Sequence, residues 1–210
     1  NVKGGIECDL TVVRRAENDF YIVTGTGFAV HDFDWIARNL CGDVHLADVT
    51  SGQAVLSLMG PTSRDILQSL TPDDLSNAAF PFGAAHEIDL AHARVWAIRR
   101  SFVGELGFEL LIPTEFVAHV VEAVEAAGKP HGLRPAGMFA LGACRLEKGF
   151  RHFGHDIGEE DTPLETGLGF AVDFGKADFT GRAALLAQKA ARPVPINRTV
   201  ALRIDGATAE

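Results

Sequence analysis

Apolar and polar residues alternate along the first part of the chain. In the stretch IECDLTVVR, residues 6–14, every second residue from Ile6 to Val12 is apolar, which is the period of a half-buried strand. The polar turn AEND separates this stretch from a second predicted strand, FYIVT, at residues 20–24. Apolar runs of similar length predict further strands at residues 44–49, 54–58, 94–100, 107–113 and 168–174.

Other stretches carry apolar residues at helical spacing. Residues 31–40 place Phe33, Ile36 and Leu40 on one face, with Asp32 near the cap. In residues 114–128 a long apolar face follows Thr114, a candidate cap. The same spacing predicts helices at residues 60–70, 135–149 and 180–192.

The order of these elements predicts an α+β fold built from antiparallel sheet with helices packed on one face. The segment TPDDLSNAAFPFG, residues 71–83, is rich in turn-forming residues and predicts a connection between modules. Strands and helices recur in a similar order after it. We therefore expect two α+β modules, residues 1–80 and residues 81–210.

Composition and charge narrow the classes of partner. A net charge of −9 and a pI near 5.3 argue against binding to nucleic acid. No apolar stretch approaches the roughly 20 residues that cross a bilayer, and the first residues do not resemble a signal peptide, so we expect neither a membrane partner nor export. Cys8, Cys41 and Cys144 have no paired spacing, which predicts reduced thiols in the core of a cytoplasmic protein.

Three acidic residues stand out among apolar or glycine-rich neighbours. Asp9 follows the Gly4-Gly5 pair, and it is either part of a solvated strand face or a carboxylate beside a closely approaching ligand or backbone. Glu109 lies between Phe108 and Leu110 in a predicted strand, where a carboxylate needs a specific partner. Glu105 is predicted to be an exposed turn residue.

Arg145 lies on an otherwise apolar stripe of the helix predicted at residues 135–149. Its guanidinium either snorkels at the edge of the stripe or is held by a carboxylate. His152, His155 and Asp156 have a spacing that can bind a metal, but the glycines around them favour an acidic surface loop, so we predict no metal site. The chain has no G-x-S-x-G elbow, no P-loop and no dinucleotide-binding glycine motif.

Six strings, in this order, resemble the glycine cleavage T-protein (aminomethyltransferase) family. They are N-x-x-GGI-x-x-DLTV at 1–12, GPTSRDIL at 60–67, VGELGFELLIP at 103–113, LRPAGMFAL at 133–141, CRLEKGFRHFGHDI at 144–157 and TPLETGLGFAV at 162–172. VGELGFE, and RLEKG with GHD, are most similar to the C-terminal region of dimethylglycine and sarcosine dehydrogenases. The resemblance covers most of the chain.

The resemblance implies a tetrahydrofolate-binding fold of ferredoxin-like modules, followed in the family by a β-barrel. It also implies a fragment that lacks the start of the first module and the terminal barrel. By motif, Asp9 falls on the carboxylate at the reactive folate amine and Glu109 on the residue that grips the pterin. Arg145 falls near the pterin ring, and Phe102 stands where the family usually has tyrosine.

The family's second strand, which offers mainly backbone contacts to folate, corresponds here to Ile22, Val23 and Thr24. The implied reaction is transfer of an aminomethyl or methylene group to tetrahydrofolate, giving 5,10-methylenetetrahydrofolate. Expected partners are folate, a one-carbon donor, and a flavin oxidoreductase domain or a lipoyl carrier protein. FAD is expected only in an upstream domain that is absent here.

Two further functions stay open. Relatives that bind folate without this transfer suggest a non-catalytic regulatory module, which Phe102 slightly favours because it lacks the tyrosine hydroxyl. The third is a folate-dependent demethylase that acts on a sulfur or oxygen methyl donor. The first hypothesis, an aminomethyltransferase-like enzyme from a dimethylglycine/sarcosine-type demethylating protein, is the one we carry forward.

Overall fold

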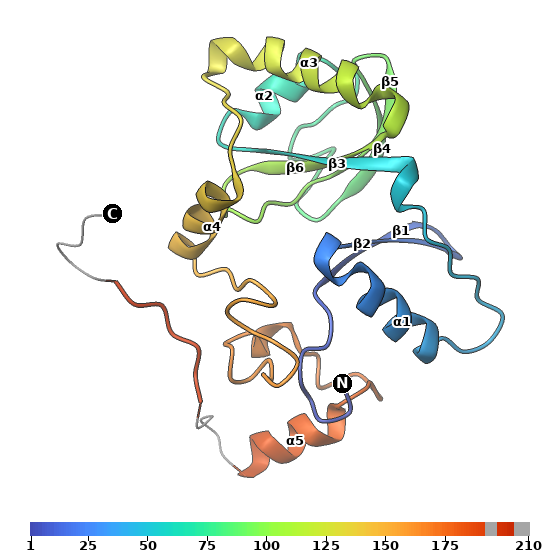
Figure 1. Cartoon of the computed structure of the whole chain (residues 1–210), viewed down its shortest axis with the longest axis vertical. Helices are drawn as coiled ribbons and strands as arrows, with labels where there is room; N and C mark the ends of the chain where they lie inside the picture. The colour runs from blue at the N-terminus through green and yellow to red at the C-terminus, as the bar shows by residue number, and fades with distance from the viewer. Residues whose placement is uncertain (192–196, 204–210) are drawn as a thin grey trace. The chain divides into compact units, whose positions relative to one another are not determined.

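The computed structural model describes residues 1–191 and 197–203 (Figure 1). The chain forms two compact units, Asn1–Leu40 with Arg151–Glu210, and Cys41–Phe150. This division differs from the modules expected at residues 1–80 and 81–210. The boundary at residue 80 falls inside the second unit, because strands from both sides of it pair in one sheet.

The first unit opens with a two-stranded antiparallel hairpin, β1 (Leu10–Ala16) and β2 (Asp19–Thr24). A 3-10 turn, η1 (Thr26–Phe28), leads into α1 (Ala29–Asn39), as the sequence predicts. The first strand is shorter than expected: residues 6–9 lie outside β1. Their backbone turns elsewhere, since the Ile6 N–H donates to the Asp161 carbonyl at 2.9 Å.

The first unit continues after residue 150 with irregular chain, η5 (Gly169–Ala171) and α5 (Arg182–Ala191). The predicted strand at residues 168–174 is wrong. Its backbone closes local turns instead, with the Leu168 N–H donating to Pro163 and the Ala171 N–H to Leu168. The helix predicted at residues 180–192 is confirmed as α5; Arg192 lies outside the described residues.

The second unit holds a four-stranded antiparallel sheet with strand order β3-β6-β5-β4. Its strands are β3 (Gln53–Met59), β4 (Ala85–Leu90), β5 (Ala93–Ile98) and β6 (Gly107–Pro113). β4 was not predicted, and the strand expected at residues 44–49 is irregular chain that leads into η2 (Thr50–Gly52).

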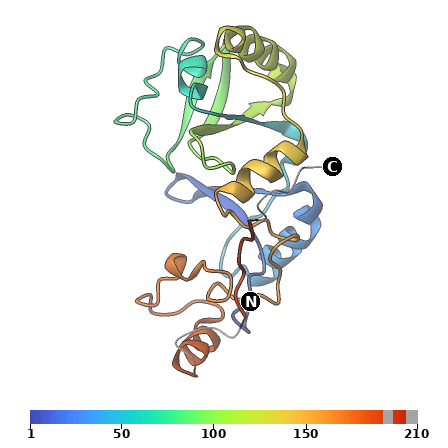
Figure 2. The same cartoon turned by 90° about the vertical axis from the view of Figure 1, so that its left-hand side faces the viewer.

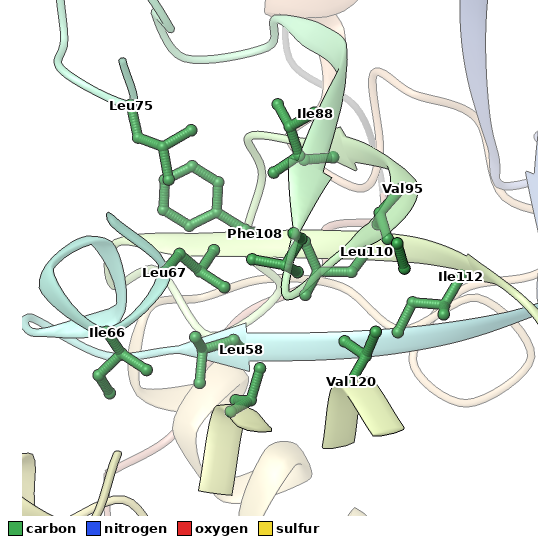
Figure 3. Packing of buried hydrophobic residues seen from close by; sticks show 14 of the residues in the cluster. Leu58, Ile66, Leu67, Leu75, Ile88, Val95, Phe108, Leu110, Ile112 and Val120 are labelled. Atoms are coloured by element: carbon green, nitrogen blue, oxygen red, sulfur yellow. The ribbon is translucent and has the colours of Figure 1, made fainter. Parts of the chain in front are cut away.

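Two helices, α2 (Ser63–Gln68) and α3 (Val117–Gly128), cover one face of this sheet (Figures 1 and 2). α3 follows η3 (Thr114–Phe116) and ends at η4 (Lys129–His131). Figure 3 shows apolar side chains of strands and helices meeting between these layers. Phe108, Leu110 and Ile112 of β6 are fully buried there, and each such side chain contributes about 1.5 to 3 kcal/mol. The predicted α+β fold is confirmed.

The helix predicted at residues 135–149 is confirmed as α4 (Met138–Glu147), but part of its apolar stripe faces solvent. Phe139 is 98% exposed and Met138 71% exposed. The three cysteines are free thiols, as predicted, yet Cys41 and Cys144 are exposed rather than in the core. Among the described residues, no helix combines the length and hydropathy that a membrane span requires.

Candidate functional site

Asp9 lies in the segment that enters β1. It is exposed, one residue before the strand begins at Leu10, so the predicted position inside the strand is wrong by one residue. Its carboxylate accepts no hydrogen bond from the parts of the chain that the structure describes. The direction of this side chain is therefore set by the backbone that carries it.

That backbone packs closely against another segment of the first unit. A Cβ on Gly5 would collide with the carbonyl oxygen of Glu159. The Gly5 N–H also donates to the Asn1 side-chain oxygen at 3.0 Å. One of the two expectations for the Gly4-Gly5 pair, close approach of another backbone, is thus met at Gly5.

A buried carboxylate, Asp32, lies in the first turn of α1 behind this segment. It is 1% exposed and has three neighbours: the Thr24 hydroxyl donates to one oxygen, His31 Nδ1 lies 3.0 Å from the other, and the Cys8 Sγ lies within 4.8 Å of a carboxylate oxygen. Burial alone would raise the pKa of Asp32. The hydrogen bonds from Thr24 and His31, together with the nearby Cys8 thiol, outweigh it and hold the pKa below its ordinary value.

His31 links this carboxylate to a second one. Its Nε2 lies 3.3 Å from a Glu7 carboxylate oxygen, while its Nδ1 faces Asp32. The hydrogen bond to Asp32 is the main reason that the pKa of His31 is raised, and Glu7 adds to it. The imidazole thus joins α1 to the residue two positions before Asp9.

The same side chains include two sets of metal-ligand atoms. In the described part of the chain, Cys8, His31 and Asp32 form one set, and Glu7, His31 and Glu159 the other, with the atoms of each set within 4.8 Å of one another. An ion would have to displace hydrogen bonds that already satisfy both Asp32 oxygens and both ring nitrogens of His31. We therefore interpret these side chains as a hydrogen-bonded network.

The histidine pair considered as a metal site lies in a turn. The rings of His152 and His155 stack with centroids 5.1 Å apart, and the Asp156 carboxylate accepts a hydrogen bond from the His152 N–H at 2.9 Å. This arrangement uses Asp156 to close the turn, as an acidic surface loop does.

Ile22, Val23 and Thr24 form the end of β2. They pair with Val12, Thr11 and Leu10 respectively, and all three are half-buried. Thr24 therefore lies directly beside the residue that follows Asp9, and its hydroxyl is engaged by Asp32. The structure brings these predicted contact residues into one hairpin with Asp9.

In the second unit, Glu109 lies on β6 with its side chain on the face away from α2 and α3. Phe108, Leu110 and Ile112 join the core between helices and sheet, and strand alternation sends Glu109 to the other face. Its direct cross-strand neighbours are Ser57 on β3 and Ile98 on β5.

The Glu109 side chain is 13% exposed, and its charged partner is Arg100, whose Nε lies 3.4 Å from a carboxylate oxygen. Burial raises the pKa of Glu109 and the attraction of Arg100 only partly opposes it. The sequence argument identified the carboxylate but missed Arg100. A basic residue just past the end of the neighbouring strand was the available signal, because β5 and β6 are antiparallel neighbours.

The other predicted residues of this unit meet where the loop before β6 packs against the end of α4. The rings of Phe102 and Phe150 are 6.4 Å apart, and Lys148 Nζ lies 3.1 Å from the exposed carboxylate of Glu105. Arg145 is buried, at 7% exposure, and donates from its guanidinium to the Phe150 carbonyl at 3.0 Å. The interpretation that the Arg145 guanidinium snorkels to solvent at the helix edge is wrong, because the side chain is buried.

The candidate residues thus fall into two groups. Asp9 with Ile22, Val23 and Thr24 lies in the first unit, and Phe102, Glu109 and Arg145 lie in the second. Each group combines carboxylate or hydrogen-bonding chemistry with partly buried apolar surroundings. Small-molecule sites commonly combine an apolar lining with a few placed polar groups.

The comparisons with known proteins identify the family. Residues 1–176 match the family described as the GCVT N-terminal domain. The chain is 38% identical over 192 residues to dimethylglycine dehydrogenase from Rattus norvegicus, covering 90% of this chain and 22% of the relative. It is 37% identical over 190 residues to an aminomethyltransferase from Caldanaerobacter subterraneus, covering 90% of this chain and 50% of that protein. Sarcosine dehydrogenases are also similar.

Among solved structures, the glycine cleavage system aminomethyltransferase T from Bartonella henselae superposes with a TM-score of 0.76 at 26% identity, over 93% of this chain and 52% of that one. The chain belongs to the family of GCVT N-terminal domains. The predicted family is confirmed. The chain spans about a fifth to a half of the length of these relatives.

Proposed function

We propose that this chain is a tetrahydrofolate-dependent transferase domain that forms 5,10-methylenetetrahydrofolate from an aminomethyl or methylene unit. The observation that carries the proposal is Glu109: a carboxylate on an otherwise apolar strand, 13% exposed, with a pKa raised by burial. Such a group gains from a ligand that brings N–H donors. The 2-amino-4-oxo edge of a pterin presents two parallel donors, which a carboxylate accepts as a charge-assisted pair.

The other residues of the second unit would complete the pterin subsite. The Phe102 ring offers an apolar face for the ligand ring. Arg145 is held in place by its hydrogen bond to the Phe150 carbonyl, and its planar fork suits a pterin carbonyl or a carboxylate. Each group is anchored in the protein before folate arrives, which lowers the entropy lost on binding.

In the first unit, Asp9 would act on the folate amine. Tetrahydrofolate, when bound, supplies the amine nitrogens that accept the carbon. The Asp9 carboxylate would orient that amine and accept its proton, and as a fixed negative charge it would favour an electron-poor carbon. Its exposure leaves both oxygens accessible to a ligand, and Ile22, Val23 and Thr24 would line the approach with backbone groups.

The test compares wild-type full-length protein with Asp9→Asn. Anaerobic calorimetric titration measures tetrahydrofolate binding, and carbon-13 in the N-methyl group of dimethylglycine or sarcosine reports carbon transfer. We expect Asp9→Asn to bind folate within about threefold of wild type and to lose transfer by about 100-fold to 10,000-fold. Asp19→Asn, the same change at the first residue of β2, where the side chain is 50% exposed, is the matched control and should transfer carbon normally.

The alternative is a non-catalytic folate-binding module, and Phe102 is the residue that favours it. Folate binding combined with equal transfer by wild type and Asp9→Asn would support this alternative and remove the enzyme proposal. Failure of the wild type to bind tetrahydrofolate would remove both.

The remaining partners and the compartment are part of the proposal. By analogy with the dehydrogenases that the chain matches, we expect a flavin oxidoreductase domain with FAD in the complete protein, or a lipoyl carrier as the donor. We propose the cytoplasm as the compartment; the three free thiols among the described residues are consistent with a reducing compartment. Fractionation of the native host cells tests it.

A further inference from the structure

Asp32 is a buried carboxylate that the proposed reaction does not use. It is 1% exposed, and removing an ionised carboxylate from water is costly unless several donors satisfy it. An apolar residue in the first turn of α1 could pack in the same place without that cost. The role of Asp32 can therefore be inferred from the side chains that donate to its carboxylate.

These donors hold the chain on both sides of Asp9. The Cys8 Sγ, immediately before Asp9, lies within 4.8 Å of an Asp32 carboxylate oxygen, and His31 connects Asp32 to Glu7 two residues before Asp9. On the other side, Leu10 pairs with Thr24 in the hairpin, and the Thr24 hydroxyl donates to Asp32. One carboxylate thus ties both flanks of Asp9 to α1.

His31 connects Asp32 to Glu7, which lies one residue further from Asp9 than Cys8 does. Its Nδ1 lies 3.0 Å from Asp32 and its Nε2 lies 3.3 Å from Glu7. Burial, with help from Asp32, raises the pKa of the Cys8 thiol to about 12, so Cys8 remains a thiol that can donate at physiological pH. Glu7 is held by His31, whereas the Asp9 carboxylate accepts no hydrogen bond within the described chain.

We propose that Asp32 is a positioning residue for Asp9: by fixing Thr24 and, through His31, Glu7, it orients the backbone that aims the Asp9 carboxylate. The inference rests on the proposed role of Asp9. A displacement of a reacting group by about 1 Å can cost about 100-fold in rate, so loosening these flanks should lower carbon transfer more than folate binding.

The test measures carbon transfer and tetrahydrofolate affinity in full-length protein carrying Asp32→Asn, alone and combined with Asp9→Asn. We expect Asp32→Asn to lower kcat by about 10-fold to 100-fold and to change the folate Kd by less than threefold. In the Asp9→Asn background the additional loss should vanish, because Asp32 acts through Asp9. Asp34→Asn, an exposed carboxylate on the same helix, is the matched control.

A loss of the same size in both backgrounds would overturn the inference, since it would show that Asp32 acts independently of Asp9. An Asp9→Asn variant with full activity would instead remove the proposed function itself, so the two failures are distinguishable. If Asp32→Asn does not fold, the Thr24→Val and Thr24→Ser pair replaces it, because the Thr24 hydroxyl donates to Asp32. We expect Thr24→Val to lower kcat and Thr24→Ser, which keeps the hydroxyl donor, to restore it; unchanged transfer by Thr24→Val would contradict the inference.

Discussion

Arg100 and Glu109 form an ion pair between the segment that follows β5 and the middle of β6, with Nε 3.4 Å from the carboxylate. The attraction of Arg100 does not fully offset the cost of burying the Glu109 carboxylate, because the pKa of Glu109 stays raised despite Arg100. A carboxylate that the protein leaves underpaired is destabilising in the folded state at neutral pH. The pair therefore links stability and ligand binding at one residue.

Replacing Glu109 by glutamine should separate these two properties. A raised folded-state pKa means that Glu109 costs stability as the pH rises through the range in which it ionises, so Glu109→Gln should raise the melting temperature by about 1 to 3 °C at pH 7. The gain should shrink below pH 4. Tetrahydrofolate affinity should fall by about 10-fold to 100-fold, because charge-assisted bonds become neutral ones.

Melting curves and titration calorimetry on the same samples check this prediction. Glu105→Gln is the matched control, since Glu105 lies on the neighbouring loop with its side chain 45% exposed. A Glu109→Gln variant that is less stable than wild type at pH 7 would show that the Arg100 attraction exceeds the cost of burial.

A substitution at Phe102 can test the proposal by adding a hydroxyl group, which should strengthen folate binding. Its ring packs beside Phe150 with centroids 6.4 Å apart and is half-buried. Phe102→Tyr adds the hydroxyl that the family usually carries, and one added hydrogen bond should strengthen folate binding by about 3-fold to 10-fold. Phe116→Tyr, at a 40% exposed ring in η3, should leave the affinity unchanged. Equal affinities for Phe102→Tyr and wild type would place the ring outside the folate contacts.

The core of the second unit supports this site, and Leu110 is its most direct test. Leu110 is fully buried on β6, next to Glu109 in sequence and on the opposite face. Leu110→Ala should destabilise the unit by about 2 to 5 kcal/mol through lost burial and a residual cavity. Denaturant unfolding followed by tryptophan fluorescence measures it, since Trp96 lies on β5 of the same sheet. Leu146→Ala, at a 52% exposed position on α4, should cost less than about 1 kcal/mol.

The sequence predicted those elements whose apolar period is strong and local. β6 and α3 have the expected limits within a few residues, because their buried faces repeat at two and at 3.6 residues. β4 was missed although Ile88 and Leu90 alternate with charged residues. The turn that joins it to β5 places Ala91 and His92 at positive φ, where glycine or asparagine would have been the usual signal.

The site was predictable where a residue type conflicted with its local pattern. Glu109 could be identified because a carboxylate between Phe108 and Leu110 is unusual in a strand. Asp32 was interpreted only as a residue near the cap of a helix, because acidic residues are common in a first turn. Its partner Thr24 and its neighbour Cys8 are 8 and 24 residues away along the chain, and single-sequence periodicity carries no information about such contacts.

The His31 and Asp32 pair gives a prediction for the pH dependence of stability. The raised pKa of His31 means that its contribution is fully present below its unfolded value near 6.5 and is lost as the pH rises through the higher folded value. The lowered pKa of Asp32 means that its contribution is present above about pH 4 and is lost as the pH falls through the lower folded value.

The difference in melting temperature between wild type and His31→Gln should therefore be largest between about pH 5 and 6 and should decline toward pH 8. His45→Gln, at an exposed histidine of the other unit, is the control. Because the His31 side chain is 45% exposed, 1 M salt should reduce the effect. A His31→Gln difference that grows above pH 7 would mean that the neutral imidazole, rather than the ion pair with Asp32, provides the stabilisation.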